Sequence, residues 1–203
     1  MHKEILTSEQ VELLPLIQKF SKDFILVGGT AIALHLGHRQ SIDFDLFTTK
    51  KFNSKRIEKK IEKRRKIDKT FIRNDEEYTL MVHKVKVTFF NFEHAVPAPL
   101  MLDKIIAVPN LLTLAAMKAF ALGYRGKWKD YVDLYFIIKD HFSVDQISAK
   151  AKELFKGEFN ARILREQLSF FGDVSYREKV DFMPGFAVSE KKIQKALMEF
   201  SVS

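Results

Sequence analysis

Apolar and polar residues follow one another in the first part of the chain in a pattern that predicts both helices and strands. Residues 8–20 carry apolar side chains at helical spacing, and residues 24–27 form an apolar run short enough for a buried strand. Gly28 and Gly29 end this run, and residues 30–36 return to helical spacing. The pattern therefore predicts a helix, a strand, a glycine turn and a second helix.

The next stretch, residues 42–47, alternates strictly between two sides, which is typical of a half-buried strand. Asp43 and Asp45 therefore point the same way. A basic helix is expected next, at residues 53–66. Three strand-like segments rich in β-branched and aromatic residues follow, at 70–73, 78–82 and 85–90. Together these segments predict a mixed sheet.

The second half of the chain is predicted to be helical. Three prolines mark a connecting segment at residues 97–109. Beyond it, helical spacing recurs in five segments, at 110–123, 128–139, 143–155, 160–170 and 190–200. We therefore expect an α/β (α+β) fold, with a small mixed-sheet core flanked by helices at residues 1–108. Residues 109–203 are expected to form a helical region packed on that core.

Composition excludes several classes of protein. Apolar residues make up 46% and charged residues 30% of the 203 residues, as in ordinary globular proteins. The chain has no cysteine, which excludes a disulfide framework and a thiolate zinc site. No apolar run approaches the roughly twenty residues that span a bilayer, and the first residues lack a secretory signal. These features predict a cytoplasmic protein with no membrane partner.

Positive charge is concentrated in one segment. The formal net charge is +8, and residues 50–73 alone hold twelve basic and three acidic side chains. A concentrated basic face attracts polyanions such as RNA, DNA or nucleoside triphosphates. The alternative is a solvated helix that only keeps the protein in solution.

Candidate chemistry lies between the glycine turn and the alternating strand. Two carboxylates at i and i+2 on a strand can share Mg²⁺ with substrate phosphates. Glycines at a helix start let the backbone approach a phosphate, and Thr30 would add a hydroxyl. Alone, the Gly28-Gly29 pair is explained by a tight turn, and Asp43 and Asp45 by a solvated strand face. Their combination across one strand, turn, helix and strand predicts a metal–triphosphate site.

This combination resembles the first motif of nucleotidyltransferases with the DNA polymerase β-type fold. The residues that carry the resemblance are Gly28, Gly29, Thr30, Arg39, Ser41, Asp43 and Asp45. Residues 118–134 are similar to the later helical motif of one group within them, the AbiEii/AbiGii toxins of abortive-infection and toxin–antitoxin systems. The matching residues of this second motif are Lys118, Arg125, Lys129, Asp130 and Asp133. The resemblance covers roughly residues 24 to 136.

The resemblance implies a Mg²⁺-dependent (or Mn²⁺-dependent) nucleotidyltransferase. Asp43 and Asp45 would hold the metal, and an acceptor would attack the α-phosphorus of a nucleoside triphosphate with pyrophosphate leaving. Lys118 and Asp133 would complete the catalytic residues. The substrate-binding residues would be Gly28, Gly29, Thr30, Arg39, Ser41, Arg125, Lys129 and Asp130. The acceptor would be RNA, such as tRNA, or protein, and a separately encoded antitoxin would be a partner in toxin–antitoxin function or phage defence.

One expected residue is missing from the pattern. The wider superfamily usually supplies a third carboxylate from a following strand, but residues 85–90 place Lys86 and Thr88 on their polar side. We expect Asp133 to replace it, with Glu93 and His94 as weaker substitutes. For Asp130 and Asp133, a structural ion pair with Arg125 or Lys129 is an equal alternative.

Three functions fit the sequence. The first is a toxin that transfers a nucleoside monophosphate to RNA or protein. The second is a nucleotide-binding module that has lost turnover, because the third carboxylate is missing. The third is a basic RNA-binding protein that uses the helix within residues 50–73.

Overall fold

The computed structural model describes residues 1–124 and 126–203. The helices are α1 (Ser8–Ile17), α2 (Gly28–Leu36), α3 (Ser54–Glu62), α4 (Leu111–Leu122), α5 (Trp128–Asp140), α6 (Val144–Phe155), α7 (Ala161–Ser169) and α8 (Glu190–Val202). The strands are β1 (Ile25–Val27), β2 (Asp43–Thr48), β3 (Ile67–Arg73), β4 (Glu77–Val82), β5 (Val85–Asn91), β6 (Leu100–Leu102) and β7 (Ile106–Val108).

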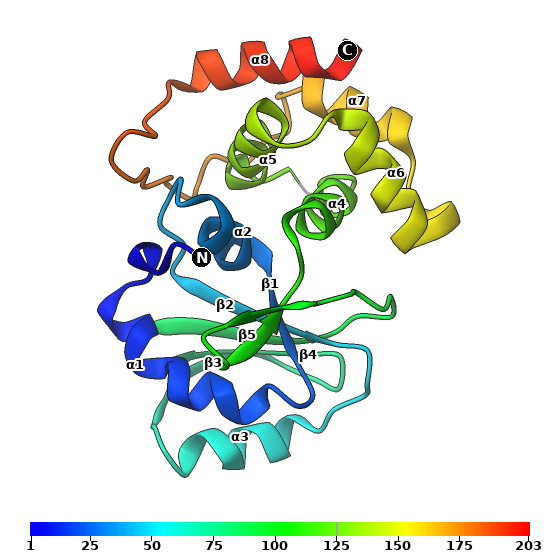
Figure 1. Ribbon diagram of the computed structural model, residues 1–203. Helices are drawn as coiled ribbons and strands as arrows, with labels where there is room; N and C mark the ends of the chain where they lie inside the picture. Colours follow the sequence, from blue (N-terminus) through cyan, green and yellow to red (C-terminus); the bar gives the residue numbers. More distant parts are fainter. Residues whose placement is uncertain (125) are drawn as a thin grey trace.

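A mixed sheet forms the centre of the first half, as the sequence predicts. Its strands lie in the order β1-β2-β5-β4-β3. The β2–β5 pair is parallel and the other pairs are antiparallel. Helices α1 and α3 lie on one side of the sheet, and α2, α4 and α5 lie on the other (Figure 1). The predicted mixed α/β fold with a helical second half is therefore confirmed.

Local signals explain where several elements begin and end. Thr7 and Gln10 form a reciprocal capping box that starts α1 at Ser8. Gly37 ends α2 with a φ of 68°, a left-handed conformation that suits glycine. His83 and Lys84 both have positive φ, as a two-residue hairpin turn between β4 and β5 requires.

The structure differs from the sequence prediction in two segments. The connecting segment at residues 97–109 holds the hairpin of β6 and β7, whose three-residue strands are too short to show an alternating pattern. Helix α3 ends at Glu62 rather than at residue 66, because no apolar side chain follows Ile61 in the run of basic residues that could anchor a further turn.

One hydrophobic core joins the two halves of the chain. The buried side chains of the sheet and those of α4, α5, α6, α7 and α8 belong to a single cluster. Between α1 and the sheet, the ring of Phe89 meets the rings of Phe20 and Phe24 at centroid distances of 4.8 and 5.2 Å, edge to face. The division at residue 108 therefore stays a prediction. Among the described residues, the helices lack the combination of length and apolar character that crossing a membrane requires.

Candidate active site

The two aspartates of β2 lie on the floor of a cleft between the sheet and α4. Strand alternation leaves Asp43 and Asp45 half-exposed while Phe44 and Leu46, on the opposite face, are fully buried. The cleft has a volume of about 490 Å³. Its charged lining residues are Asp43, Asp45, Glu77, Lys86, Lys118 and Lys127. The predicted carboxylate pair is thus accessible to a ligand from one side.

Gly28 brings the start of α2 against one of these carboxylates. Its φ is 74°, and a Cβ atom at this position would lie 2.1 Å from Asp45 Oδ2. Glycine is therefore required both by the backbone conformation and by the close approach. At Gly29, a Cβ atom would lie 2.6 Å from Arg39 Nη2. Because both residues are glycines, the N-terminus of α2 can lie directly against the carboxylate of Asp45 and the buried guanidinium of Arg39.

Thr30 and Ser41 fasten α2 to the beginning of β2. Thr30 is 1% exposed, and its hydroxyl lies 2.9 Å from Ser41 Oγ and also contacts the backbone carbonyls of Ser41 and Asp43. These contacts hold the strand that carries the aspartates against the glycine turn. Among the described residues that line the cleft, neither Thr30 nor Ser41 occurs. Their expected contact with a phosphate stays a prediction, and the structure gives them a positioning role.

Lys86 faces the first aspartate from the neighbouring strand. Asp43 and Lys86 are partners in the β2–β5 register, and Lys86 Nζ lies 2.7 Å from Asp43 Oδ2. Burial alone would lower the pKa of Lys86, but the hydrogen bond and the charge of Asp43 outweigh it and raise that pKa. Thr88 is the register partner of Asp45. An ammonium group and a hydroxyl therefore stand beside the carboxylates where a third acid was expected.

Behind the cleft lies a buried ion cluster, formed by Arg39, Lys118, Asp130 and Asp133. Arg39 holds Asp133 with two hydrogen bonds, Nε to Oδ1 at 2.7 Å and Nη2 to Oδ2 at 2.9 Å. Lys118 Nζ lies 2.7 Å from Asp130 Oδ1 and 3.2 Å from Asp133 Oδ2. All four side chains are at most 8% exposed. The cluster ties the loop after α2 to α4 and α5.

Charge pairing keeps Asp133 and Lys118 ionised in spite of burial. Burial would raise the pKa of Asp133, but Arg39 and Lys118 hold it well below its ordinary value. Burial would likewise lower the pKa of Lys118, which Asp130 and Asp133 raise instead. His38 also contacts Asp133, with Nε2 2.8 Å from Oδ1, yet burial lowers the pKa of this imidazole. His38 is therefore a neutral donor to an ionised carboxylate.

The geometry does not support the expectation that Asp133 replaces the third metal carboxylate. Asp133 is fully buried, and both of its oxygens are engaged by Arg39, Lys118 and His38. Glu93, a weaker substitute, is exposed beyond the end of β5. His94, the other, contacts Glu158 at 3.3 Å. Arg39 and Lys118 stabilise the carboxylate of Asp133 in the protein interior, because a buried charge needs partners of opposite charge.

Lys129, of the second motif, shares an acidic partner with a residue of the cleft. Lys129 is 3.5 Å from Glu178, and Lys127, which lines the cleft, is 2.8 Å from the same carboxylate. The hydrogen bond from Lys127 lowers the pKa of Glu178 to about 2. Arg125 lies outside the described residues. Lys86 and Lys127 were not among the predicted site residues, although the alternation of β5 already placed Lys86 on the polar face.

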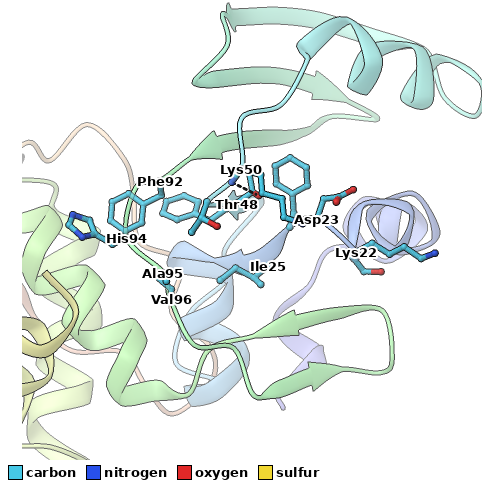
Figure 2. Close-up of a pocket in the computed structure, with 13 residues that line it drawn as sticks. Lys22, Asp23, Ile25, Thr48, Lys50, Phe92, His94, Ala95 and Val96 are labelled. Carbon is cyan, nitrogen blue, oxygen red and sulfur yellow. Dashed lines mark hydrogen bonds between the residues drawn. The ribbon is translucent and has the colours of Figure 1, made fainter.

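A second cavity of about 260 Å³ lies near the other end of β2 (Figure 2). Thr48, Lys50, Phe92 and His94 are on its walls, together with Ile25 of β1, and Lys50 donates its backbone N–H to Thr48 Oγ1 at 3.2 Å. Phe47 and Phe92 line both this cavity and the cleft. Among its described lining residues, Asp23 is the single acid. The cleft with the paired carboxylates is therefore the stronger candidate for chemistry.

The donor set of the cleft suits a metal ion that is shared with a substrate. Within the described part of the chain, no three His, Cys, Asp or Glu side chains gather into a group able to hold a metal. Mg²⁺ is commonly held by one or two carboxylates together with phosphate oxygens and water. Asp43 and Asp45 fit this mode of binding, since both lie on the accessible face of β2.

Known proteins similar to this chain agree with the fold. The chain is 27% identical to an uncharacterised protein of Aquifex aeolicus (strain VF5) over 187 residues. This alignment covers 88% of each of the two chains. MenT4, the nucleotidyltransferase toxin Rv2826c of Mycobacterium tuberculosis H37Rv, superimposes with a TM-score of 0.61 at 14% identity over 95% of this chain and 81% of that one. JHP933 of Helicobacter pylori gives a TM-score of 0.55 at 16% identity, over 97% and 92%.

A family match covers most of the sequence. Residues 16–199 match the family described as "Nucleotidyl transferase AbiEii toxin, Type IV TA system". This range includes both sequence motifs, the cleft and the buried ion cluster. The chain therefore belongs to the AbiEii nucleotidyltransferase toxin family of type IV toxin–antitoxin systems.

Proposed function

We propose that this toxin-family nucleotidyltransferase transfers a nucleoside monophosphate from a nucleoside triphosphate to an RNA acceptor. The observation that carries the proposal is the placement of Asp43 and Asp45 on one strand face, against Gly28 at the start of α2. A helix start favours phosphate through its free N–H groups and its dipole. In this proposal the two carboxylates hold the metal ion, and the helix start beside Asp45 binds phosphate oxygens of the same triphosphate.

A divalent ion on Asp43 and Asp45, Mg²⁺ or Mn²⁺, would neutralise charge on the reacting phosphoryl group. The rest of the work falls to residues of the chain. Lys118 and Lys127 both line the cleft, and in this proposal they bind phosphate oxygens. For Lys118 this uses the third donor of an ammonium group that also contacts Asp130 and Asp133. Asp133 has a positioning role in this proposal, because it orients Arg39 and Lys118.

The basic segment supports RNA rather than protein as the acceptor. Ile57 and Ile61 bury one side of α3, and most of its basic side chains are exposed on the opposite side. Helix α3 lies on the opposite side of the sheet from α4 (Figure 1). Residues of α4 line the cleft, so α3 is on the other side of the sheet from it. An acceptor that reaches both surfaces must be an extended polyanion that passes around the edge of the sheet, as RNA can. A separately encoded antitoxin is the proposed protein partner.

Label transfer tests the proposed reaction. The wild-type protein is incubated with Mg²⁺, each α-labelled nucleoside triphosphate in turn, and total tRNA. We expect label to enter RNA with one of the nucleotides, and Asp43→Asn or Asp45→Asn to reduce the rate at least about 100-fold, the scale of losing one electrostatic contact to the transition state. Asp140→Asn, at the exposed end of α5, is the matched control and should leave the rate unchanged.

Other outcomes separate the remaining functions. Metal-dependent nucleotide binding without any transfer would favour the module that has lost turnover. RNA binding that is indifferent to Asp43→Asn, but lost when basic residues in and directly after α3 are neutralised, would leave only the RNA-binding protein. The residues to neutralise are Lys59, Lys63, Arg64 and Lys66. The control set of exposed lysines elsewhere is Lys179, Lys191, Lys192 and Lys195.

A further inference from the structure

Lys86, on the neighbouring strand β5, forms an ion pair with Asp43, the first of the two cleft aspartates. Lys86 and Asp43 are register partners in parallel strands, so strand geometry places their side chains on one face. Their charged atoms are 2.7 Å apart, and the side chains are 36% and 30% exposed. The contact is therefore built into the floor of the cleft rather than made by chance between mobile surface groups.

The next acid on this face does not restore a third carboxylate beside the pair. Glu77 lines the cleft from β4, one strand beyond β5, and accepts a hydrogen bond from Thr79 Oγ1 at 2.6 Å. Thr79 is in turn the register partner of Thr88. Asp43, Asp45 and Lys86 together carry a net charge of minus one. A site with three carboxylates and no lysine would carry minus three.

Charge limits how many divalent ions such a floor can hold. Two Mg²⁺ ions about 4 Å apart repel each other, and closely placed carboxylates reduce that repulsion. An ammonium group beside one carboxylate repels a divalent ion that approaches the same oxygen atoms. The ammonium group of Lys86 thus supplies one positive charge beside Asp43, where a second metal ion would otherwise have to supply it.

We propose that Lys86 takes the place of the second ion of a two-metal phosphoryl-transfer site, so that this site binds a single divalent cation together with the nucleotide. The inference rests on the proposed function, since it concerns the same triphosphate site. In this arrangement Asp43 and Asp45 would hold the single cation together with phosphate oxygens. The Lys86 ammonium supplies the second positive charge from the β5 side of the cleft.

Counting bound Mn²⁺ tests this inference without measuring catalysis. Mn²⁺ is titrated against the protein at a saturating concentration of a non-hydrolysable triphosphate analogue, and bound Mn²⁺ is counted by electron paramagnetic resonance. Binding of the analogue is measured separately by displacement of a fluorescent nucleotide. The variants are Lys86→Glu, which adds the missing acid, and Lys69→Glu. Lys69 is an exposed residue of β3. It pairs with Met81 of β4, which in turn pairs with Lys86, so both lysines lie in one row across the sheet. Lys69→Glu therefore introduces the same change of charge outside the cleft.

The expected result is one Mn²⁺ per bound analogue in the wild-type protein and in Lys69→Glu. Lys86→Glu should bind two, with the spin-coupled signal of neighbouring Mn²⁺ ions. Two ions in the wild-type protein would overturn the inference, as would one ion in a folded Lys86→Glu variant that still binds the analogue. Failure of the wild-type protein to bind the analogue would instead contradict the proposed function on which the inference rests.

Discussion

The cleft and the buried ion cluster use the same kinds of side chain for different purposes. In the cleft, Asp43 faces Lys86 at 2.7 Å with about a third of each side chain exposed. In the buried ion cluster, Asp133 faces Arg39 at the same 2.7 Å with almost no exposure. An exposed pair contributes little to stability and can exchange its partner for a ligand. A buried pair cannot, because each charge would be left without solvent or partner.

This difference assigns separate tasks to the acids that the sequence grouped together. Asp43 and Asp45 line the cleft and are the proposed metal ligands, while Asp133 holds the loop after α2 to α4 and α5. Lys118 belongs to both regions, since it pairs with Asp130 and Asp133 and also lines the cleft. The buried ion cluster is therefore the support through which α4 and α5 set the shape of the cleft.

The largest expected effect is on stability, at the centre of the buried ion cluster. Replacing Asp133 with Ala leaves Arg39 and Lys118 without their shared partner in a buried site. We expect the free energy of unfolding to fall by about 3–5 kcal/mol, the usual cost of breaking a buried pair from one side. Urea unfolding followed by circular dichroism measures it.

The matched variant in the cleft is Asp43→Asn. Because Asp43 is partly exposed and its pair with Lys86 is screened by water, the free energy of unfolding should change by less than about 1 kcal/mol. Equal destabilisation by Asp43→Asn and Asp133→Ala would show that the two regions do not differ as described.

A smaller loss of stability is expected at the glycine turn, where the cleft itself is structurally constrained. Gly28→Ala combines a left-handed backbone with a Cβ atom 2.1 Å from Asp45 Oδ2. We expect a loss of about 1–3 kcal/mol, together with weaker Mn²⁺ binding because Asp45 must move. Gly157→Ala is the control, since a Cβ atom there meets nothing within 4 Å. A stable Gly28→Ala variant with unchanged Mn²⁺ affinity would contradict the close approach.

The smallest expected effect is a dependence of stability on pH through His38. Burial lowers the pKa of His38 below its ordinary value of 6.5, and the positive charges of Arg39 and Lys118 lower it further. The contact with Asp133 opposes this shift but does not cancel it. The unfolded chain therefore takes up a proton first as the pH falls. Stability from this group is fully present above pH 6.5 and is lost as the pH falls toward the pKa of the folded protein.

The measurement is the free energy of unfolding between pH 8 and pH 5. Its slope from this one group cannot exceed about 1.4 kcal/mol per pH unit. His38→Gln should flatten the curve, whereas His141→Gln, at an exposed position after α5, should leave it unchanged. An identical curve for wild-type protein and His38→Gln would exclude His38 as the source.

Apart from the hairpin of β6 and β7, the order of the main elements was predictable from the sequence, and so was the carboxylate pair. A strand of six residues places alternate side chains on opposite faces whatever its neighbours are, so Asp43 and Asp45 had to share a face. The glycine turn and the capping residues likewise act over a few residues. The family resemblance, carried by the two motifs, is confirmed by the match over residues 16–199.

Contacts between distant segments decided the rest. Arg39 and Asp133 are 94 residues apart in the chain, and they form a buried ion pair. This pairing removes from the cleft an acid that was predicted to replace the third carboxylate. The pairing of Asp43 with Lys86 depends on the register of two strands that are not adjacent in the chain. The basic segment was visible in the sequence, but only packing through Ile57 and Ile61 placed it on the far side of the sheet. Short-range geometry follows from local backbone preferences, whereas burial and charge pairing depend on which surfaces meet when the chain folds.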